Sequence, residues 1–273
     1  MKIFNDKIAI VTGGASGIGR SLCEDLCSAG ATVVAADINS KGADSTVQAV
    51  TACGGDACAS CVDVTSEKDI QKLIDETVAK YGRIDYMFNN AGIAIHGEVR
   101  DIDLDHWRRI IDINLMGILY GTLAAYKQMV KQGFGHIVNT SSVLGLVGMG
   151  LNALYATTKY AIVGLSTSLR SEAKGLGVKV SVVCPGFIQT NLYDSATIVK
   201  ADSKEFYGEV PFKRIDVKTA SKKILKGVAR NKSIIIFPMH AKLMWWATRM
   251  NPDALDMAGA YSMKKFRAIR KDV

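Results

Sequence analysis

Short apolar runs alternate with longer stretches of mixed polarity along this chain. The short runs are apolar at both odd and even positions, as in strands that other elements cover on both faces of a sheet. They lie at residues 7–12, 31–36, 57–62, 84–89, 135–140, 178–184 and 233–237. Helical stretches fill the gaps, notably residues 17–29, 66–80, 103–131 and 152–174. This alternation predicts a doubly wound α/β fold, with a seven-stranded, mostly parallel sheet and helices on both faces.

The length of 273 residues falls in the range where a single α/β domain buries a full core. Residues 1–238 are expected to form that domain, and residues 239–273 a helical extension of it. Residues 1–6 carry no extended apolar run, and no window of the sequence approaches the ~18 to 20 uninterrupted apolar residues that span a bilayer. A cytoplasmic location, with at most peripheral contact with a membrane, is therefore expected.

A glycine-rich turn follows the first predicted strand directly. Gly13, Gly17 and Gly19 stand in the segment TGGASGIG, which also contains Ser16 and Ile18, and a helical stretch comes next. Gly13 permits a tight turn, Gly17 lets the backbone approach a pyrophosphate, and Gly19 allows the helix to pack closely on the strand. Strand, glycine turn and helix in this order predict a dinucleotide site of the Rossmann type.

Asp37 ends the second predicted strand, close to the usual offset from such a turn. A carboxylate at this place accepts hydrogen bonds from the adenosine 2′-hydroxyl and repels a 2′-phosphate. The neighbours Ile38 and Ser16 are not basic, so no cation is evident to receive NADP. The predicted cofactor is NAD, although an N-terminal helix cap is an alternative role for Asp37.

Further motifs resemble the short-chain dehydrogenase/reductase superfamily over residues 4 to about 238. Besides the glycine turn, they are Asn89-Asn90-Ala91-Gly92 after the fourth predicted strand and the catalytic motifs below. In that family the pair at Asp63 and Val64 meets the adenine, and the turn Asn90-Ala91-Gly92 supports the sheet and the cofactor. Asp63 would otherwise be only a neighbour of a helix cap.

The resemblance implies four catalytic residues, namely Asn114, Ser142, Tyr155 and Lys159. Tyr155 and Lys159 stand four apart within a predicted helix and therefore share one face. A free tyrosine has a pKa of roughly 10. Lys159 and a nicotinamide cation are expected to lower the pKa of Tyr155, which then acts as acid and base. Ser142 is expected to hold the substrate oxygen, and the resemblance assigns Asn114 to a water that links Lys159 to solvent, and Lys159 also to the nicotinamide ribose.

A Pro-Gly segment follows the sixth predicted strand. It reads Cys184-Pro185-Gly186-Phe187-Ile188-Gln189-Thr190. The resemblance places Pro185 and Gly186 at the nicotinamide, with Ile188 and Thr190 on its carboxamide; an ordinary turn is the alternative. Because ligands in such folds bind beyond the carboxyl ends of the strands, the functional interpretation is favoured.

Two segments that set substrate choice in this family are rich in apolar residues. The predicted substrate residues are Ser142, Leu144, Met149, Tyr155, Phe187, Leu192 and Tyr193, with Leu146, Val147, Leu151 and Leu154 nearby. Apolar pockets with one anchored oxygen suit lipophilic ligands, although packing in the core would explain many of these side chains equally well. The predicted activity is NAD-dependent interconversion of a secondary alcohol and a ketone on a steroid, long-chain, terpenoid or aromatic substrate.

The basic charge is concentrated late in the chain. Residues 200–273 contain 17 Lys/Arg and 7 Asp/Glu, whereas the whole chain has a net charge of +8. Residues 239–273 extend beyond the usual end of compact family members and place Trp245 and Trp246 among Lys242 and Arg249. A membrane-facing helix, a dimer interface and a lid over the substrate each explain this composition. A homodimer or homotetramer is the expected assembly.

Two other functions are compatible with the sequence. A basic tail that steers an anionic carrier would suit a 3-hydroxyacyl-thioester dehydrogenase. The fold would also suit a catalytically silent NAD-binding regulator, but the presence of the whole tetrad of Asn114, Ser142, Tyr155 and Lys159 argues against that function. Nucleic-acid binding is not expected, because no helix-turn-helix, zinc-finger or RNA-binding signature accompanies the charge. No metal is expected either, since Cys58 and Cys61 stand three apart on a predicted strand and point to opposite faces.

Overall fold

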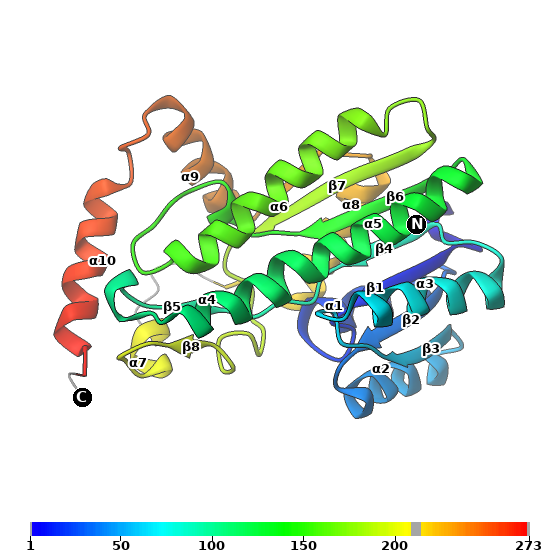
Figure 1. The fold of residues 1–273 in the computed structure, drawn as a ribbon, viewed down its shortest axis with the longest axis horizontal. Helices are drawn as coiled ribbons and strands as arrows, with labels where there is room; N and C mark the ends of the chain where they lie inside the picture. Colours follow the sequence, from blue (N-terminus) through cyan, green and yellow to red (C-terminus); the bar gives the residue numbers. More distant parts are fainter. Residues whose placement is uncertain (1, 209–213, 272–273) are drawn as a thin grey trace.

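A parallel sheet organises the computed structural model, which describes residues 2–208 and 214–271. Within these residues the sheet has seven strands in the order β3-β2-β1-β4-β6-β7-β9, with every pairing parallel (Figure 1). The strands are β1 Ile8–Thr12, β2 Thr32–Asp37, β3 Asp56–Cys61, β4 Tyr86–Asn89, β6 Gly135–Thr140, β7 Val178–Pro185 and β9 Ile234–Phe237. The predicted seven-stranded sheet is confirmed.

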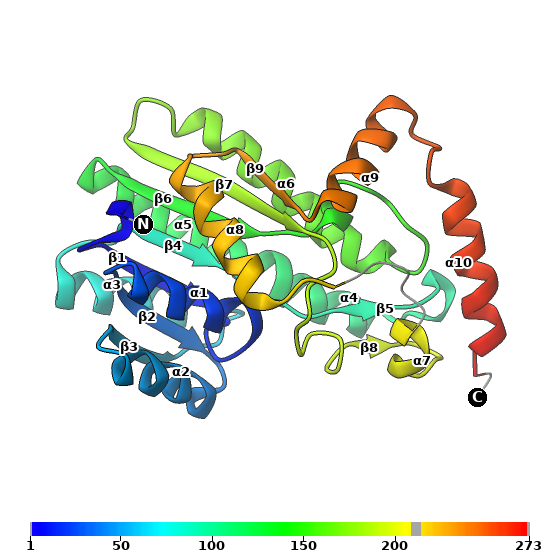
Figure 2. The ribbon, with the colours of Figure 1, turned by 180° about the vertical axis from the view of Figure 1, so that it is seen from behind.

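Helices cover both faces of this sheet, as predicted. One face carries α1 Gly17–Ser28, α2 Ser40–Ala52 and α8 Val217–Ala229 (Figure 2). The other face carries α3 Glu67–Tyr81, α5 Gly117–Gln132 and α6 Ala153–Glu172 (Figure 1). The strand order reverses between β1 and β4, which lie side by side. In open α/β sheets, the crevice beyond the carboxyl ends of the strands at such a point is where ligands bind.

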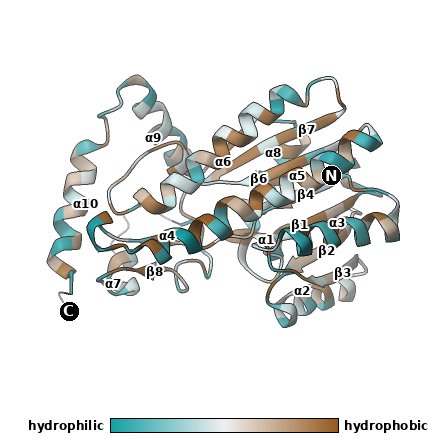
Figure 3. Ribbon diagram, in the orientation of Figure 1, coloured by the Kyte–Doolittle hydropathy of each residue, from teal (hydrophilic) through white to brown (hydrophobic). Residues whose placement is uncertain are grey.

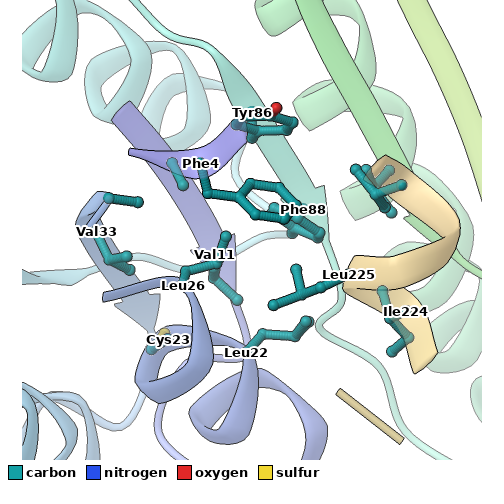
Figure 4. Close-up of a cluster of buried hydrophobic side chains, with 14 of the residues drawn as sticks. Phe4, Val11, Leu22, Cys23, Leu26, Val33, Tyr86, Phe88, Ile224 and Leu225 are labelled. Atoms are coloured by element: carbon teal, nitrogen blue, oxygen red, sulfur yellow. The ribbon is translucent and has the colours of Figure 1, made fainter. Parts of the chain in front are cut away.

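The two faces of the sheet explain why the strands are apolar at both parities. Val11 packs with Leu22 and Leu26 of α1 and with Leu225 of α8, in the cluster drawn in Figure 4. Its neighbour Ile10 points to the opposite face, into the cluster under α3, α5 and α6. The strands accordingly carry the hydrophobic colour along much of their length in Figure 3. Both side chains are fully buried.

The helix predicted over residues 103–131 is interrupted in the structure. α4 Leu104–Ile111 and α5 are joined by a π-helical turn at Asp112–Met116. Such turns insert an extra residue into a helix and are frequent at functional sites. Here the turn contains the buried Asn114.

The remaining elements gather beyond the carboxyl ends of the strands. β5 Ile95–His96 pairs in parallel with β8 Thr197–Ile198, and α7 Ser203–Gly208 follows. The predicted helical extension forms α9 Met239–Met250 and α10 Asp256–Ile269 at this same end of the molecule (Figures 1 and 2). Over the described part of the chain, none of the helices combines the length and the apolar character that a bilayer crossing needs.

Candidate active site

A cavity of about 890 Å³ lies at this end of the molecule, and nearly all the predicted site residues line it. They come from the glycine turn, the ends of β2, β3, β4, β6 and β7, and the start of α6. Gly19 and Asn114 are the two predicted residues outside the lining. The fold therefore brings together motifs that are spread over residues 13–193 of the sequence.

The glycine turn has the geometry that the sequence predicted. Gly13 and Gly17 adopt φ values of 70° and 53°, which favour glycine. A Cβ atom on Gly19 would lie 2.0 Å from the carbonyl oxygen of Gly13, so this position admits glycine alone. Ser16 precedes α1 in an extended conformation, and among the described residues its side chain makes no cap hydrogen bond. The first-turn N–H groups of α1 thus suit an anionic group.

The carboxylate of Asp37 connects the glycine turn to the end of β2. One oxygen accepts a hydrogen bond from the N–H of Ala15 at 3.0 Å, and the other from the N–H of Asn39 at 2.9 Å. The helix-cap alternative is wrong, because Asn39 is the residue that caps α2. Asp37 lines the cavity beside the exposed Ile38.

Asp63 lies both at the cavity and beside the start of α3. It lines the cavity with Val64. Its Oδ1 also accepts hydrogen bonds from the N–H and the hydroxyl of Thr65, at 2.9 and 2.8 Å, just before Ser66 caps α3. The carboxylate is thereby held in place by the start of the next helix.

Thr12 fixes the Asn-Ala-Gly turn and was missed by the sequence analysis. Its hydroxyl accepts hydrogen bonds from the N–H groups of Asn90 and Ala91, at 3.0 and 3.2 Å. The side-chain amide of Asn90 donates in return to the carbonyl of Thr12 at 3.2 Å. These bonds join the ends of β1 and β4, which adjoin only in the folded sheet, so no local signal marks Thr12.

Asn114 clamps the chain that follows this turn. Its side chain accepts a hydrogen bond from the N–H of Ile93 at 2.8 Å and donates to the carbonyl of Ile93 at 2.9 Å. A Cβ atom on Gly92 would lie 3.1 Å from Asn114 Oδ1 and 3.6 Å from Lys159 Nζ. The side chains of Asn114 and Lys159 therefore both lie close to Gly92.

Tyr155, Lys159 and Ser142 meet where α6 passes the end of β6. Lys159 Nζ donates a hydrogen bond to the carbonyl of Thr140 at 3.1 Å and lies 5.4 Å from the centre of the Tyr155 ring. The hydroxyl of Ser141 donates to the carbonyl of Lys159 at 2.8 Å, which ties α6 to the strand end. The side chain of Ser142 is hydrogen-bonded to that of Tyr155.

Burial dominates the proton affinities of this group. It raises the pKa of the Tyr155 phenol above its ordinary value, although the hydrogen bond with Ser142 acts to lower it. Burial also lowers the pKa of Lys159 to about 8. The protein's own residues therefore raise the pKa of Tyr155, whereas the sequence predicted that it is lowered. The reason is that the cost of burying a phenolate outweighs the contacts that favour it. Lowering by a bound cation stays a prediction.

The predicted substrate residues Leu144, Met149, Phe187, Leu192 and Tyr193 all line the cavity. Val147 and Leu154, which were named as nearby residues, are buried outside the cavity lining, so for these two the alternative of packing in the core applies. Residues that the sequence analysis missed complete the wall, namely His96 of β5, Asn152, Phe206 and Tyr207 of α7, and Tyr261 and Phe266 of α10. Asn152 directly precedes α6, whereas the other five belong to elements that are distant from Tyr155 and Lys159 in the sequence.

α10 forms one side of the cavity and is held there by ion pairs. Arg267 Nε lies 2.8 Å from Glu98 Oε1, and an amino nitrogen of Arg270 lies 2.9 Å from Asp101 Oδ1. The Glu98 side chain is almost fully buried. Phe266 is buried as well and meets Phe206 edge to face at 6.1 Å. Part of the C-terminal extension is therefore a wall of the cavity.

The cysteine pair singled out in the sequence diverges in the structure. Cys58 Sγ lies 3.6 Å from the Tyr81 hydroxyl, whereas Cys61 Sγ lies 3.9 Å from the carbonyl of Ile38. Within residues 2–208 and 214–271, His, Cys, Asp and Glu side chains form no group of three that would hold a metal ion.

Comparisons with known proteins agree with this arrangement. The sequence model of the short chain dehydrogenase family matches residues 7–201. The oxidoreductase SadH of Mycobacterium tuberculosis is 31% identical over 97% of this chain and 98% of its own. The cyclohexanol dehydrogenase of an Acinetobacter species is 34% identical over 72% of this chain and 80% of its own. A short chain dehydrogenase/reductase from Burkholderia phymatum, crystallised with NAD, shares the fold with a TM-score of 0.86 at 24% identity, over 93% of this chain and 96% of that one.

Proposed function

This chain belongs to the short chain dehydrogenase family, and we propose that it interconverts a secondary alcohol and a ketone with NAD(H) as the hydride carrier. The observation that carries the proposal is the meeting of Tyr155, Ser142 and Lys159 in a cavity whose other end is the glycine turn. The name of the related cyclohexanol dehydrogenase supports the same reaction class.

The residues at the glycine-turn end fit a dinucleotide. Gly13 and Gly17 line the cavity without a side chain, and the uncapped start of α1 offers N–H groups for a pyrophosphate. The Asp37 carboxylate lines the cavity next to the apolar Ile38, which favours a ribose hydroxyl over a phosphate and hence NAD over NADP. When bound, the nicotinamide accepts or supplies the hydride.

The chain's own residues handle the proton. In alcohol oxidation, Tyr155 as phenolate takes the hydroxyl proton while Ser142 holds the substrate oxygen; in ketone reduction, the protonated Tyr155 returns it. Lys159, with a pKa of about 8, exchanges a proton readily near neutral pH. We propose that Asn114 holds the water through which this proton reaches solvent.

The substrate end favours a lipophilic molecule. Leu144, Met149 and Phe187 form one side of it, and Tyr261 and Phe266 of α10 form another. Steroid, long-chain, terpenoid and aromatic frames all fit this chemistry. A 3-hydroxyacyl-thioester dehydrogenase is the second candidate, because 3-oxoacyl-[acyl-carrier-protein] reductases of Thermotoga maritima and Synechocystis are 35% identical to this chain. In its disfavour, Arg267 and Arg270 are paired with Glu98 and Asp101.

We propose that residues 239–273 belong to the same domain and act as a lid, since α10 lines the cavity. The outward face of α9 carries an exposed apolar stripe. It is formed by Met239, Leu243, Trp246 and Met250, with exposed fractions of 65, 62, 68 and 87%. α9 has no acidic residue and carries Lys242 and Arg249. This composition favours contact with an anionic membrane surface. A homodimer or homotetramer in the cytoplasm remains our proposal for the assembly.

The reaction is tested by incubating the protein with NAD and a panel of secondary alcohols while NADH absorbance is followed. We expect turnover of bulky apolar alcohols, with the Tyr155→Phe variant as the matched negative control. Turnover that is equal in the variant, or confined to acyl thioesters, would contradict the proposal.

A further inference from the structure

Two buried polar atoms beside Tyr155 have no partner in the described parts of the chain. They are Nδ1 of His96 and the hydroxyl oxygen of Tyr207. The two residues are only 6 and 8% exposed, and both line the cavity. Buried polar atoms are nearly always hydrogen-bonded, so two unpartnered atoms in the wall of one cavity indicate that a ligand atom supplies the partner.

The backbone and the surrounding rings hold these atoms in place. The carbonyl of His96 accepts a hydrogen bond from the N–H of Val199 at 2.8 Å, and Gly97 is bonded to Leu151 at 2.9 Å. The His96 ring lies 5.7 Å from the Tyr155 ring and 5.8 Å from the Tyr207 ring, which it meets edge to face. A rigid polar pair therefore stands next to the proposed proton donor.

Both groups are neutral near pH 7. Burial lowers the pKa of the His96 imidazole to about 4, and the side chain of Asn152 is hydrogen-bonded to the ring. Burial raises the pKa of the Tyr207 phenol, which stays protonated. A neutral imidazole offers one donor and one acceptor, and a phenol offers both. Such a pair supplies hydrogen bonds but no countercharge of its own, so it suits an uncharged oxygen better than a carboxylate. The Arg214 guanidinium nearby lies over the faces of the Tyr193 and Tyr207 rings, 4.4 and 6.0 Å from their centres.

We propose that His96 Nδ1 and the Tyr207 hydroxyl form a polar subsite that binds a second, uncharged oxygen of the substrate, close to the carbon that is oxidised or reduced. The inference rests on the proposed function and narrows its substrate class. The preferred substrates are apolar frames with two neighbouring oxygens, such as diols, hydroxyketones and diketones, instead of simple secondary alcohols.

The test compares substrates that differ by one oxygen. Octan-2-ol is paired with octane-2,3-diol, and cyclohexanol with cyclohexane-1,2-diol, and the ratio of kcat/KM for diol over mono-ol is measured with NAD. In the wild type we expect a ratio above about ten, because a site built to bond an oxygen rejects the analogue that lacks it. The ratio should fall at least tenfold in both His96→Leu and Tyr207→Phe.

A conservative variant separates recognition from folding. His96→Asn keeps a polar atom near the position of Nδ1 and should retain most of the ratio, whereas His96→Leu removes that atom. If the pair were merely structural, both substrates would lose kcat/KM by the same factor and the ratio would not move. If His96→Leu does not fold, Tyr207→Phe carries the test alone.

The outcomes also distinguish the subsite from the reaction itself. Turnover of mono-ols and diols with a ratio near one in the wild type overturns the subsite and leaves the proposed activity standing. Absence of NAD-dependent turnover on every alcohol and ketone overturns the proposed function. A ratio that stays above ten in both His96→Leu and Tyr207→Phe would assign the second oxygen to other residues and refute the inference.

Discussion

Lys159 Nζ stands 5.4 Å from the centre of the Tyr155 ring, one turn along α6, and donates to the Thr140 carbonyl at 3.1 Å. The ammonium group of Lys159 therefore lies over the ring of Tyr155 while one of its N–H groups is hydrogen-bonded to the last residue of β6. Burial raises the pKa of Tyr155 and lowers that of Lys159. We expect a bound positive charge beside this pair to favour the phenolate form of Tyr155.

Replacing Tyr155 by Phe should abolish turnover. The change removes the hydroxyl that moves the proton and keeps the ring, so NAD affinity should stay within about threefold. General acid/base groups contribute ~100-fold or more to the rate, and kcat should fall by at least that factor. Steady-state kinetics and fluorescence titration with NADH measure the two effects. A variant with more than a tenth of wild-type activity would refute the assigned role.

Cofactor preference should follow the Asp37 carboxylate. The double variant Asp37→Ser, Ile38→Arg replaces a repelling charge with an attracting one and should move preference towards NADP, by raising kcat/KM for NADP and lowering it for NAD. The ratio of the two values is the measurement. Ile38→Arg alone serves as the control, because the carboxylate still opposes a 2′-phosphate. Wild-type protein that prefers NADPH would show the cofactor assignment to be wrong.

Removing the tail should change substrate choice more than chemistry. A stop after Pro238 deletes the α10 wall but leaves the glycine turn and the tetrad, so small ketones should react comparatively well and bulky ones poorly. Glu98→Gln is a milder version, since it weakens the ion pair with Arg267 without shortening the chain. Competition between a small and a bulky ketone reports the selectivity. Loss of NAD binding on truncation would indicate a purely structural tail.

The α9 stripe should bind anionic vesicles. The protein is expected to sediment with vesicles of phosphatidylcholine and phosphatidylserine, more weakly with phosphatidylcholine alone, and less at high salt. Replacing Leu243 and Trp246 with Gln should abolish the binding. Sedimentation equilibrium on the same variant is the control. If vesicles do not bind and the variant has a lower mass than the wild type, the stripe is an interface between copies.

Acid should destabilise the fold through two buried histidines. Burial lowers the pKa of His96 to about 4 and of His136 to about 3, whereas an exposed histidine has a pKa near 6.5. Between these values the unfolded chain binds more protons than the folded protein, so the free energy of unfolding falls as the pH falls below 6.5. From pH 7.5 to pH 5 each histidine should remove on the order of 2 kcal/mol.

Urea unfolding at the two pH values measures this loss. His96→Asn removes one titrating group, so its stability should fall less than that of the wild type over the same interval. Carboxylates titrate alike in both proteins and cancel in the comparison. An identical fall in the two proteins would mean that His96 is not held neutral by the fold.

The residues proposed for catalysis and cofactor binding could be singled out from the sequence because each belongs to a local pattern with its own physical constraint. Gly13 and Gly17 need positive φ, and Tyr155 and Lys159 need only the spacing of one helical turn. Thr12 and Tyr207 were not predictable, because their importance arises from contacts with segments far away in the chain. The π turn around Asn114 was missed for a related reason, since the chain stays helical through Asp112–Met116 and no proline marks that segment.

The sequence by itself determined the parallel sheet and the edge at which its motifs meet, because strands apolar on both parities must be covered on both faces and their carboxyl ends then adjoin. Only the tertiary structure decided what encloses the substrate end. The ion pair between Arg267 and Glu98 spans 169 residues of sequence, and the pairing of His96 with Ile198 is also distant. Contacts at such separation depend on how whole elements pack, which no local spacing of residues encodes.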